Sequence, residues 1–439
     1  MSSRPSTVRS TRRERWAWYL YDFGNSAYAA VVLLAVYSAY FKGTVVGGAE
    51  GSRLWGIAVG IAMLVVAVTS PILGTLADFS GGKKRFLVIF TALNVIFCGL
   101  LFFVQRGDWL LGMVFFILAE IGYRSAQVFY NALLPEIAEP EDMSRVSGNG
   151  WAIGSFGGII CLLIVLVPVV ISGSNPLVVR LSLVFTAIYF AVSSLPLVFW
   201  LRERAAPQAL PANESYFSLA LKRLGETFQT ARSMKEFIKF MVAFLIYNDG
   251  ILMTLNFAAI LGAVLYGMEQ QELVIFMIIV QVTSVAGAYL FGLLASDFGG
   301  KRALITSLLL MVVPVVWLIF SHSRLEFYVI GGIAGFALTG VQSVSRTMVG
   351  MLSPQEKSAE FYGFFAVTGR TSSFIGPTVF GLLAAEATEW YQRARSLAPL
   401  AAEQAGHRLA LLAIVLFLLV GLVLLLFVNE EEGRSAAQS

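Results

Sequence analysis

The chain carries one short pattern twice, once in each half. The first copy is Gly74-Thr-Leu-Ala-Asp78-Phe-Ser-Gly81-Gly-Lys83, and the second copy is Gly292-Leu-Leu-Ala-Ser296-Asp-Phe-Gly299-Gly-Lys301. Each copy follows a long apolar run and ends in basic residues just before the next apolar run. Pro135 and Pro354 also recur at corresponding places, each ahead of a glycine-containing apolar run. Internal repeats of this kind are typical of membrane proteins built from two parallel helical bundles.

The composition indicates a chain whose surface meets lipid rather than water. Of its 439 residues, 57% are hydrophobic and only 13% are charged, and the mean hydropathy is +0.77. Soluble domains carry about 25% charged residues. The net charge of +4 does not indicate a nucleic-acid partner, because basic clusters beside apolar runs are orientation signals. We therefore expect an all-α polytopic membrane protein that lies in a lipid bilayer and binds no nucleic acid.

Apolar runs long enough to cross a bilayer occur about twelve times, since a spanning helix needs about 20 apolar residues. In the first half they are Trp18–Phe41, Leu54–Leu76, Phe86–Val104, Trp109–Tyr130, Gly148–Ser172 and Val179–Trp200. In the second half they are Phe237–Val264, Leu273–Ala295, Ala303–Phe320, Phe327–Met348, Phe361–Leu383 and Leu409–Val428. Together with the repeat, these runs predict about 12 transmembrane helices in two six-helix parallel repeats.

The domain boundaries follow from these runs. We expect a cytoplasmic N-terminal tail at residues 1–17, a six-helix bundle at 18–201, a cytoplasmic linker at 202–235, a second bundle at 236–429 and a cytoplasmic tail at 430–439. In the linker, apolar residues share one helical face, which predicts an amphipathic helix on the membrane surface or against the bundle. These residues are Phe217, Leu221, Leu224, Phe228 and Ala231.

Basic residues gather in alternate connections between the apolar runs. Lys83, Lys84 and Arg85 lie in one such connection, and several more lie between Arg202 and Lys235. Because Lys and Arg favour the cytoplasmic side, this asymmetry predicts a multi-pass protein with both termini in the cytoplasm. The connection that holds Arg393, Arg395 and Arg408 is the exception.

Several motifs resemble a known superfamily. The segment Gly74–Lys84 resembles the loop signature between the second and third helices of the major facilitator superfamily, with Phe79 and Gly82 in place of two of its basic residues. The run Arg124-Ser-Ala-Gln127 resembles the fourth-helix motif of proton-coupled members, with Val128 in place of the glycine. This resemblance implies the major facilitator fold, in which helices one, four, seven and ten line a central cavity.

A closer resemblance covers nearly the whole chain. It is carried by Tyr21-Asp22-Phe-Gly-Asn25-Ser-Ala-Tyr28, Phe129-Tyr-Asn131-Ala-Leu-Leu-Pro135-Glu136, Tyr247-Asn248-Asp249-Gly250, Gln342-Ser-Val-Ser-Arg346, Glu360-Phe-Tyr-Gly363 and Gly376-Pro377. These blocks resemble the vacuole-effluxer-like, autophagy-related branch of the superfamily. The resemblance implies amino-acid efflux, as in the fungal members that export amino acids from the vacuole. It also implies a cell-membrane location if the chain is bacterial and a vacuolar-membrane location if it is fungal.

Polar residues inside the apolar runs are the candidate substrate-binding and coupling residues. Ionisable groups there cost roughly 2.5–3.5 kcal/mol and usually face a cavity or a partner. The candidates on the four cavity-lining helices are Asp22, Asn25, Glu120, Arg124, Gln127, Asn131, Asn248, Asp249, Gln342 and Arg346. The four on the fourth helix form one stripe at helical spacing. Alternatively, Glu120 and Arg124 form a purely structural pair, and Asp22 only holds helices together.

A second set of residues flanks the repeated loops. Asp78, Lys83, Lys84, Asp297 and Lys301 are candidates for gating residues. A carboxylate at the end of one helix can bind the positive N-terminus of a neighbouring helix, and breaking that contact would release a cytoplasmic gate. The alternative for the lysines is a role in topology alone.

These observations together predict a secondary active transporter, not an enzyme, that moves a small solute by alternating access. Candidate residues of both charge signs suit a neutral amino acid, since the planar fork of arginine matches a carboxylate. We expect export, a proton as the candidate coupling ion, no cofactor and a monomer. No nucleotide-binding glycine loop occurs. The alternatives are a transporter of a different metabolite, a membrane enzyme acting on lipid or peptide, and a non-transporting membrane sensor or scaffold.

Overall fold

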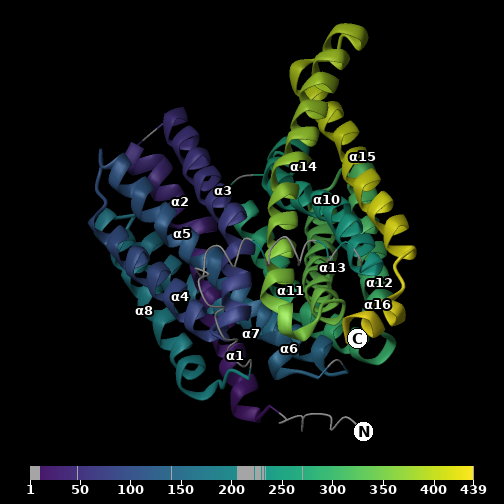
Figure 1. The fold of residues 1–439 in the computed structure, drawn as a ribbon. Helices are drawn as coiled ribbons and strands as arrows, with labels where there is room; N and C mark the ends of the chain where they lie inside the picture. Colours follow the sequence, from purple (N-terminus) through teal and green to yellow (C-terminus); the bar gives the residue numbers. More distant parts are fainter. Residues whose placement is uncertain are drawn as a thin grey trace, which may run out of the picture. The chain divides into compact units, whose positions relative to one another are not determined.

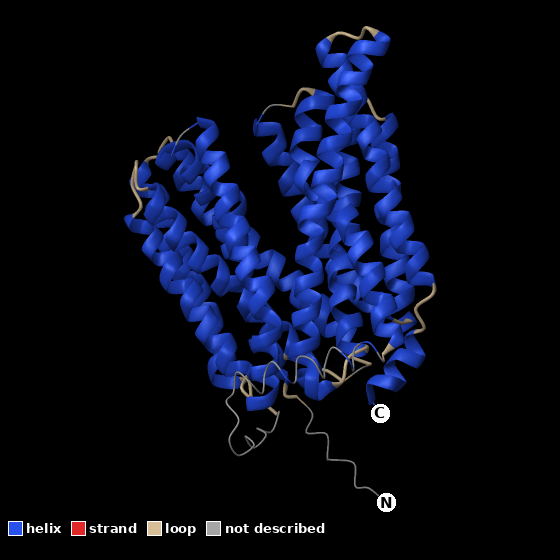
Figure 2. Cartoon of the chain, turned by 45° about the horizontal axis from the view of Figure 1, so that its top comes forward, coloured by secondary structure: helices blue, strands red, loops and turns tan. Residues whose placement is uncertain are grey.

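The computed structural model describes residues 10–46, 48–139, 141–204, 222, 229, 232, 234–268 and 270–438. All regular structure in these residues is helical, and no strand occurs among them (Figure 2). The prediction of an all-α protein is therefore confirmed. The apolar face of the predicted linker helix, Phe217 to Ala231, lies outside the described residues.

The chain forms two compact units. The first comprises residues 1–227 together with 354–363, and the second comprises residues 228–353 and 364–439. The sequence places bundles at 18–201 and 236–429, and the short segment 354–363 is the part of the second half that the structure groups with the first unit. The contacts responsible for this grouping belong to the charged cluster described below.

The first unit contains α1 (Arg12–Tyr28), α2 (Tyr37–Tyr40), α3 (Gly48–Ser80), α4 (Lys83–Leu100), α5 (Trp109–Ala132), α6 (Leu134–Ile137), α7 (Met143–Ile171) and α8 (Pro176–Trp200) (Figure 1). Two π-helical segments, Ala29–Ala35 and Phe41–Val46, continue the first span beyond α1. Helix α1 packs against α7 and α8, and α4 packs against α5 and α8. The close contact of α1 with α7 depends on glycine, because a Cβ atom on Gly157 would overlap with the carbonyl oxygen of Phe23. Small residues let helix backbones meet in lipid.

The second unit contains α10 (Lys235–Tyr266), α11 (Gln270–Phe298), α12 (Gly300–Phe320), α13 (Arg324–Met351), α15 (Pro399–Leu426) and α16 (Glu430–Gln438). Helix α14 (Ser358–Arg395) begins in the first unit and continues in the second. Within the second unit, α10 packs on α15, α11 on α13, and α12 on both α13 and α15. The same pairings occur in the first unit as α1 with α8, α3 with α5, and α4 with α5 and α8. The repeat seen in the sequence is thus a repeat of helix packing.

Most of the predicted spans appear as long apolar helices. In the described residues, 10 helices are long and apolar enough to cross a membrane. Helix α3 adds an eleventh span as two segments, Leu54–Ser70 and Ile72–Ser80, which are bent by 44°. The bend falls at Pro71, which has no backbone N–H to continue the helical ladder. The remaining predicted span, Phe361–Leu383, lies in α14, where the side chains of residues 370–374 and 377 are outside the described part. The polytopic architecture is confirmed.

Candidate functional site

The polar stripe on α5 forms a buried ion pair in the first unit. Glu120 is 0% exposed, and its Oε1 accepts a hydrogen bond of 2.7 Å from Nε of Arg124. The side chain of Arg124 is 28% exposed, and its guanidinium lies 5.1 Å from the centre of the Tyr123 ring. The predicted i, i+4 pair therefore forms, with its carboxylate closed off from solvent and its arginine still accessible.

Helix α1 places further polar groups near this pair. Tyr28 is buried and interacts electrostatically with Glu120 and Arg124. Asn25, one turn earlier on α1, is also buried. The hydroxyl of Tyr28, Oδ1 of Asn25 and Oε2 of Glu120 are inaccessible to solvent, and none meets hydrogen-bond geometry with a described residue. The Tyr28 hydroxyl nevertheless lies close enough to the Glu120 carboxylate to interact with it, so this carboxylate is placed between Arg124 and Tyr28.

The other candidates in the first unit lie around the same helices. Asp22 is buried against α7, where a Cβ atom on Gly154 would come within 2.8 Å of its carboxyl carbon. The phenol of Tyr123 interacts electrostatically with Asp22 as well as with Arg124 and Glu120. Gln127 donates a hydrogen bond of 3.0 Å from Nε2 to the hydroxyl of Tyr123. Asn131 is half-buried near the end of α5.

The candidates in the second unit include two residues that tie helices together. Oδ1 of Asp249, on α10, accepts a hydrogen bond of 2.9 Å from the backbone N–H of Gly376 on α14. Nδ2 of Asn248 lies 3.5 Å from the carbonyl oxygen of Gly369, also on α14. On α13, Arg346 is buried and Gln342 is half-buried one turn earlier. The contact with Gly376 gives Asp249 a structural role, and its role in substrate binding stays a prediction.

Lys83 is the centre of a buried charged cluster at the start of α4. Its Nζ lies 3.1 Å from Oδ1 of Asp78 and 2.9 Å from Oε1 of Glu136. The same nitrogen donates a hydrogen bond of 2.7 Å to the hydroxyl of Ser358. Oδ2 of Asp78 accepts a hydrogen bond of 2.9 Å from the backbone N–H of Glu360 in the first turn of α14. A carboxylate at the end of α3 therefore binds the N-terminus of another helix, where the helix dipole favours negative charge. The gating role of this contact stays a prediction.

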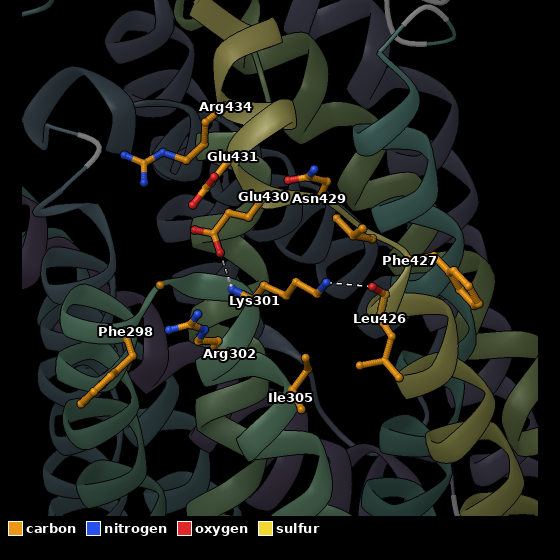
Figure 3. A pocket seen from close by; sticks show the side chains of 12 residues that line it. Phe298, Lys301, Arg302, Ile305, Leu426, Phe427, Asn429, Glu430, Glu431 and Arg434 are labelled. Atoms are coloured by element: carbon orange, nitrogen blue, oxygen red, sulfur yellow. Dashed lines mark hydrogen bonds between the residues drawn. The ribbon is translucent and has the colours of Figure 1, made fainter.

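Lys84 and Lys301 occupy equivalent positions in the two units. Nζ of Lys84 donates to the carbonyl oxygen of Leu201 at 2.7 Å, and Nζ of Lys301 donates to that of Leu426 at 2.8 Å (Figure 3). The repeated sequence pattern pairs Lys301 with Lys83 instead. The equivalence in the structure is shifted by one residue from the equivalence in the sequence pattern. The reason is that two residues separate α3 from α4, whereas one residue separates α11 from α12. Asp297, at the end of α11, is exposed.

The sequence analysis did not predict the carboxylates that accept hydrogen bonds from backbone N–H groups near the helix ends of each unit. Glu203 accepts a hydrogen bond from the backbone N–H of Lys84 at 3.2 Å, and Glu430 accepts one from that of Lys301 at 2.7 Å. Glu14 at the start of α1 accepts from the backbone N–H of Arg202 at 3.1 Å. Glu236, at the start of α10, accepts from the backbone N–H of Asn429 in the same way. The only signal in the sequence was an acidic residue near the start or the end of an apolar run.

Glu136 is the other residue whose role was missed. It belongs to a motif of the family resemblance, but no residue spacing in the sequence predicts that it lies next to Lys83. Its Oε2 also accepts a hydrogen bond of 3.0 Å from the backbone N–H of Arg204. Arg204 in turn forms an ion pair of 3.0 Å with Glu14. One carboxylate therefore connects the Lys83 cluster to the segment that follows α8.

Glu203 makes the stability of the protein dependent on pH. Burial, together with the nearby carboxylate of Glu136, raises the pKa of Glu203 from 4.5 to about 7. The folded state then binds this proton more tightly than the unfolded state does, so the contribution of Glu203 to stability falls as pH rises from about 4.5 to about 7. We expect Glu203→Gln to reduce the loss of thermal stability between about pH 5 and pH 8, measured by the unfolding temperature in detergent.

The matched control for this variant is Glu356→Gln, which neutralises an exposed carboxylate of the same unit. It is expected to leave the pH dependence of the unfolding temperature as in the unmodified protein. An unchanged pH dependence in Glu203→Gln would contradict the assignment.

The model of the family described as vacuole effluxer Atg22 like matches residues 55–438. The chain is 27% identical over 440 residues to the uncharacterized MFS-type transporter YxiO of Bacillus subtilis (strain 168), with 98% of each protein covered. It is 25% identical over 476 residues to autophagy-related protein 22 of Yarrowia lipolytica, covering 88% of this chain and 76% of the relative.

Solved structures of major facilitator transporters share the fold. The human organic anion transporter MFSD10 matches with a TM-score of 0.70 at 15% identity, covering 96% of this chain and 100% of that chain. A bacterial homologue of the iron transporter ferroportin matches with a TM-score of 0.69 at 13% identity, covering 95% of this chain and 99% of that chain. At these identities the likeness shows the fold alone.

Proposed function

Because the chain belongs to the vacuole effluxer Atg22-like family of the major facilitator superfamily, and is therefore a multi-pass membrane transporter, we propose that it exports a neutral amino acid by alternating access. A proton is the proposed coupling ion, and both termini are proposed to lie in the cytoplasm. The effluxer description of the family supports the direction. The basic residues beside the start of α4 support the orientation.

The proposal rests on the hydrogen bonds and the solvent exposure of Arg124. Its Nε is bonded to Glu120, whereas neither terminal guanidinium nitrogen makes a hydrogen bond with a described residue. The side chain is also accessible, and its outer edge forms a planar fork that can bind both oxygens of a carboxylate. An amino acid could therefore place its carboxylate on Arg124 without first breaking the bond to Glu120.

The surroundings of Arg124 suit the rest of an amino acid. The ammonium group needs acceptors, and Oε2 of Glu120 and Oδ1 of Asn25 are the candidates. The rings of Tyr28 and Tyr123 lie 4.9 Å apart and offer apolar surface for an uncharged side chain. An apolar or aromatic amino acid such as leucine or tyrosine is the substrate class that these groups favour.

Glu120 is the proposed proton carrier. Its carboxylate is fully buried and uses one oxygen for Arg124, while the other has no hydrogen-bond partner among the described residues. Protonation would weaken the bond to Arg124, because the attraction between opposite charges would be lost. Binding a proton could in this way alter the hold of Arg124 on a substrate carboxylate.

Counterflow in proteoliposomes tests the proposed substrate. Vesicles containing the purified full-length protein are preloaded with unlabelled leucine or tyrosine, and uptake of the same labelled amino acid is measured. We expect uptake above that of protein-free vesicles, and none when the vesicles are preloaded with a sugar. Absence of exchange for every amino acid tested, with protein shown to be folded and inserted, would overturn the proposal and favour a different metabolite or a non-transporting role.

A further inference from the structure

The glutamine of the α5 stripe contacts a tyrosine of the same helix. Gln127 lies one turn after Tyr123, and its Nε2 donates a hydrogen bond of 3.0 Å to the Tyr123 hydroxyl. Gln127 is half-buried, whereas Tyr123 is 5% exposed. Residues four apart share one face of a helix, so their side chains can meet in this way. The hydrogen bond holds the outer end of the Tyr123 ring.

The ring of Tyr123 in turn contacts the guanidinium of Arg124. The central carbon of the guanidinium lies 5.1 Å from the centre of the ring, which is within the reach of a cation–π interaction, about 6 Å. The ring centre of Tyr28, on α1, lies 4.9 Å from that of Tyr123 at an interplanar angle of 34°. Tyr123 therefore packs against a second aromatic ring while it contacts the arginine of its own helix.

Two contacts restrain the side chain of Arg124. Its Nε donates a hydrogen bond of 2.7 Å to Oε1 of Glu120, which fixes one edge of the guanidinium. The face of the Tyr123 ring is the second contact. An arginine that binds both oxygens of a carboxylate needs the plane of its fork held as well as its charge. The bond to Glu120 and the Tyr123 ring together provide that restraint.

The backbone of α5 is fixed against α4 directly before this ring. Nδ2 of Asn94 donates a hydrogen bond of 2.9 Å to the carbonyl oxygen of Ala119. A Cβ atom on Gly122 would come within 2.6 Å of the backbone nitrogen of Asn94 and 2.7 Å of the carbonyl oxygen of Phe90. Groups that hold a ligand in a defined geometry depend on rigid support of this kind. Tyr123 therefore stands on a helix segment that cannot shift away from α4 without losing these contacts.

We propose that Gln127 and Tyr123 are positioning residues for Arg124. Gln127 holds the ring of Tyr123, the ring holds the guanidinium, and the guanidinium binds the carboxylate of the substrate. This inference rests on the proposed amino-acid function and deepens it, because it names the residues that set the preference for a carboxylate. Gln127 then acts through Tyr123 and does not touch the substrate.

Counterflow with a competitor tests this role in proteoliposomes that contain the full-length protein. The substrate is labelled leucine or tyrosine, whichever the unmodified protein exchanges, and the competitor is the corresponding amino-acid amide, which lacks the carboxylate. In Tyr123→Leu the KM for the amino acid is expected to rise at least about fivefold, because a partly desolvated cation–π contact is lost. The preference for the amino acid over its amide should fall by a similar factor, and the maximal rate should change less.

Two milder variants separate positioning from direct binding. Tyr123→Phe keeps the ring and removes the hydroxyl, whereas Gln127→Leu removes the amide and keeps the ring. Each is expected to raise KM about threefold, and the double variant should be no worse than either, because both remove the same hydrogen bond. Gln105→Leu is the control, since it changes an exposed glutamine of the same unit, and it should leave KM and the preference unchanged.

Two transport results would overturn the proposal. One is an unchanged preference for the carboxylate in Tyr123→Leu. The other is that the effects of Tyr123→Phe and Gln127→Leu multiply in the double variant, which would mean that Gln127 acts on the substrate directly. If Tyr123→Leu does not fold, Gln127→Leu makes the first comparison, because this side chain is only half-buried.

A measurement without substrate separates this inference from the proposed function. In protein that contains isotope-labelled arginine, the NMR signal of the Arg124 Nε–H group is the one missing from Arg124→Gln. It is expected to shift in Tyr123→Leu and in Gln127→Leu, because the nearby ring changes or moves, and to stay in place in Gln105→Leu. An unshifted signal in Tyr123→Leu and Gln127→Leu would overturn the positioning role, whereas absence of exchange by the unmodified protein would overturn the proposed function.

Discussion

Lys83→Met is expected to lower the free energy of unfolding by about 3–5 kcal/mol, the usual cost of removing one partner from a buried ion pair. Lys83 is 1% exposed, and its ammonium group contacts Asp78, Glu136 and Ser358. The substitution keeps the length of the side chain but leaves two buried carboxylates without their cation. The unfolding temperature of the purified protein should fall steeply, and little folded protein should be recovered from membranes.

Lys84→Met is the matched control for this prediction. Lys84 is only half-buried, and its ammonium group donates to one backbone carbonyl. Losing that bond is expected to cost about 1 kcal/mol. Neutralising both orphaned carboxylates, as Asp78→Asn/Glu136→Gln in the Lys83→Met background, should recover part of the lost stability. Equal stability of Lys83→Met and Lys84→Met would show that the cluster does not hold the first unit together.

The fold could be predicted from the sequence because the features that a bilayer requires are short and local in the sequence. A span of apolar residues is visible without knowing its neighbours, and so is a repeated loop such as that of Gly74 to Lys83. Even the helix contact at Gly157 follows from a local rule about small residues. The bend between the two segments of α3 is also a local feature, because it falls at Pro71, which is visible in the sequence.

The charged cluster could be predicted only in part, since its members come from distant segments. Asp78 and Lys83 share one loop, and their pairing follows from that proximity. Ser358 lies 275 residues away from Lys83, and the backbone N–H of Glu360 lies 282 residues away from Asp78. No rule about residue spacing predicts contacts between residues so far apart in the sequence. The capping contacts of Glu203 and Glu430 have the same origin, because a carboxylate after one helix binds the start of another.

The candidate binding residues also divide into contacts that follow from local sequence and contacts that join distant segments. The stripe from Glu120 to Asn131 follows from helical periodicity, and the bond between Glu120 and Arg124 is its direct consequence. Asp249 differs, because its carboxylate meets the backbone of Gly376, 127 residues away. A sequence shows that a carboxylate is buried in a span, but it does not show whether a backbone N–H already satisfies it. Asp249 is for this reason a weaker candidate than Glu120 for binding a substrate.

Arg124→Gln is expected to reduce amino-acid counterflow by about 30-fold or more. Losing one member of a hydrogen-bonded charge pair costs about 2 kcal/mol or more, and the variant also loses the fork proposed to bind the substrate carboxylate. The initial rate of leucine or tyrosine counterflow is the measurement. Arg106→Gln is the control, since it removes an exposed arginine between the third and fourth spans of the same unit. Counterflow by Arg124→Gln at the rate of this control would exclude a substrate role for Arg124.

Glu120→Gln separates substrate binding from proton coupling. The variant keeps an oxygen that can accept the hydrogen bond from Arg124, so counterflow, which needs no net proton movement, is expected to continue. Transport driven by a pH gradient should be lost, because the amide binds no proton at this position. Asp22→Asn makes the same comparison for the other buried carboxylate near Tyr123. If Asp22→Asn alone abolishes gradient-driven transport while sparing exchange, Asp22 is the proton carrier and Glu120 only positions Arg124. If both variants keep gradient-driven transport, neither carboxylate couples transport to protons.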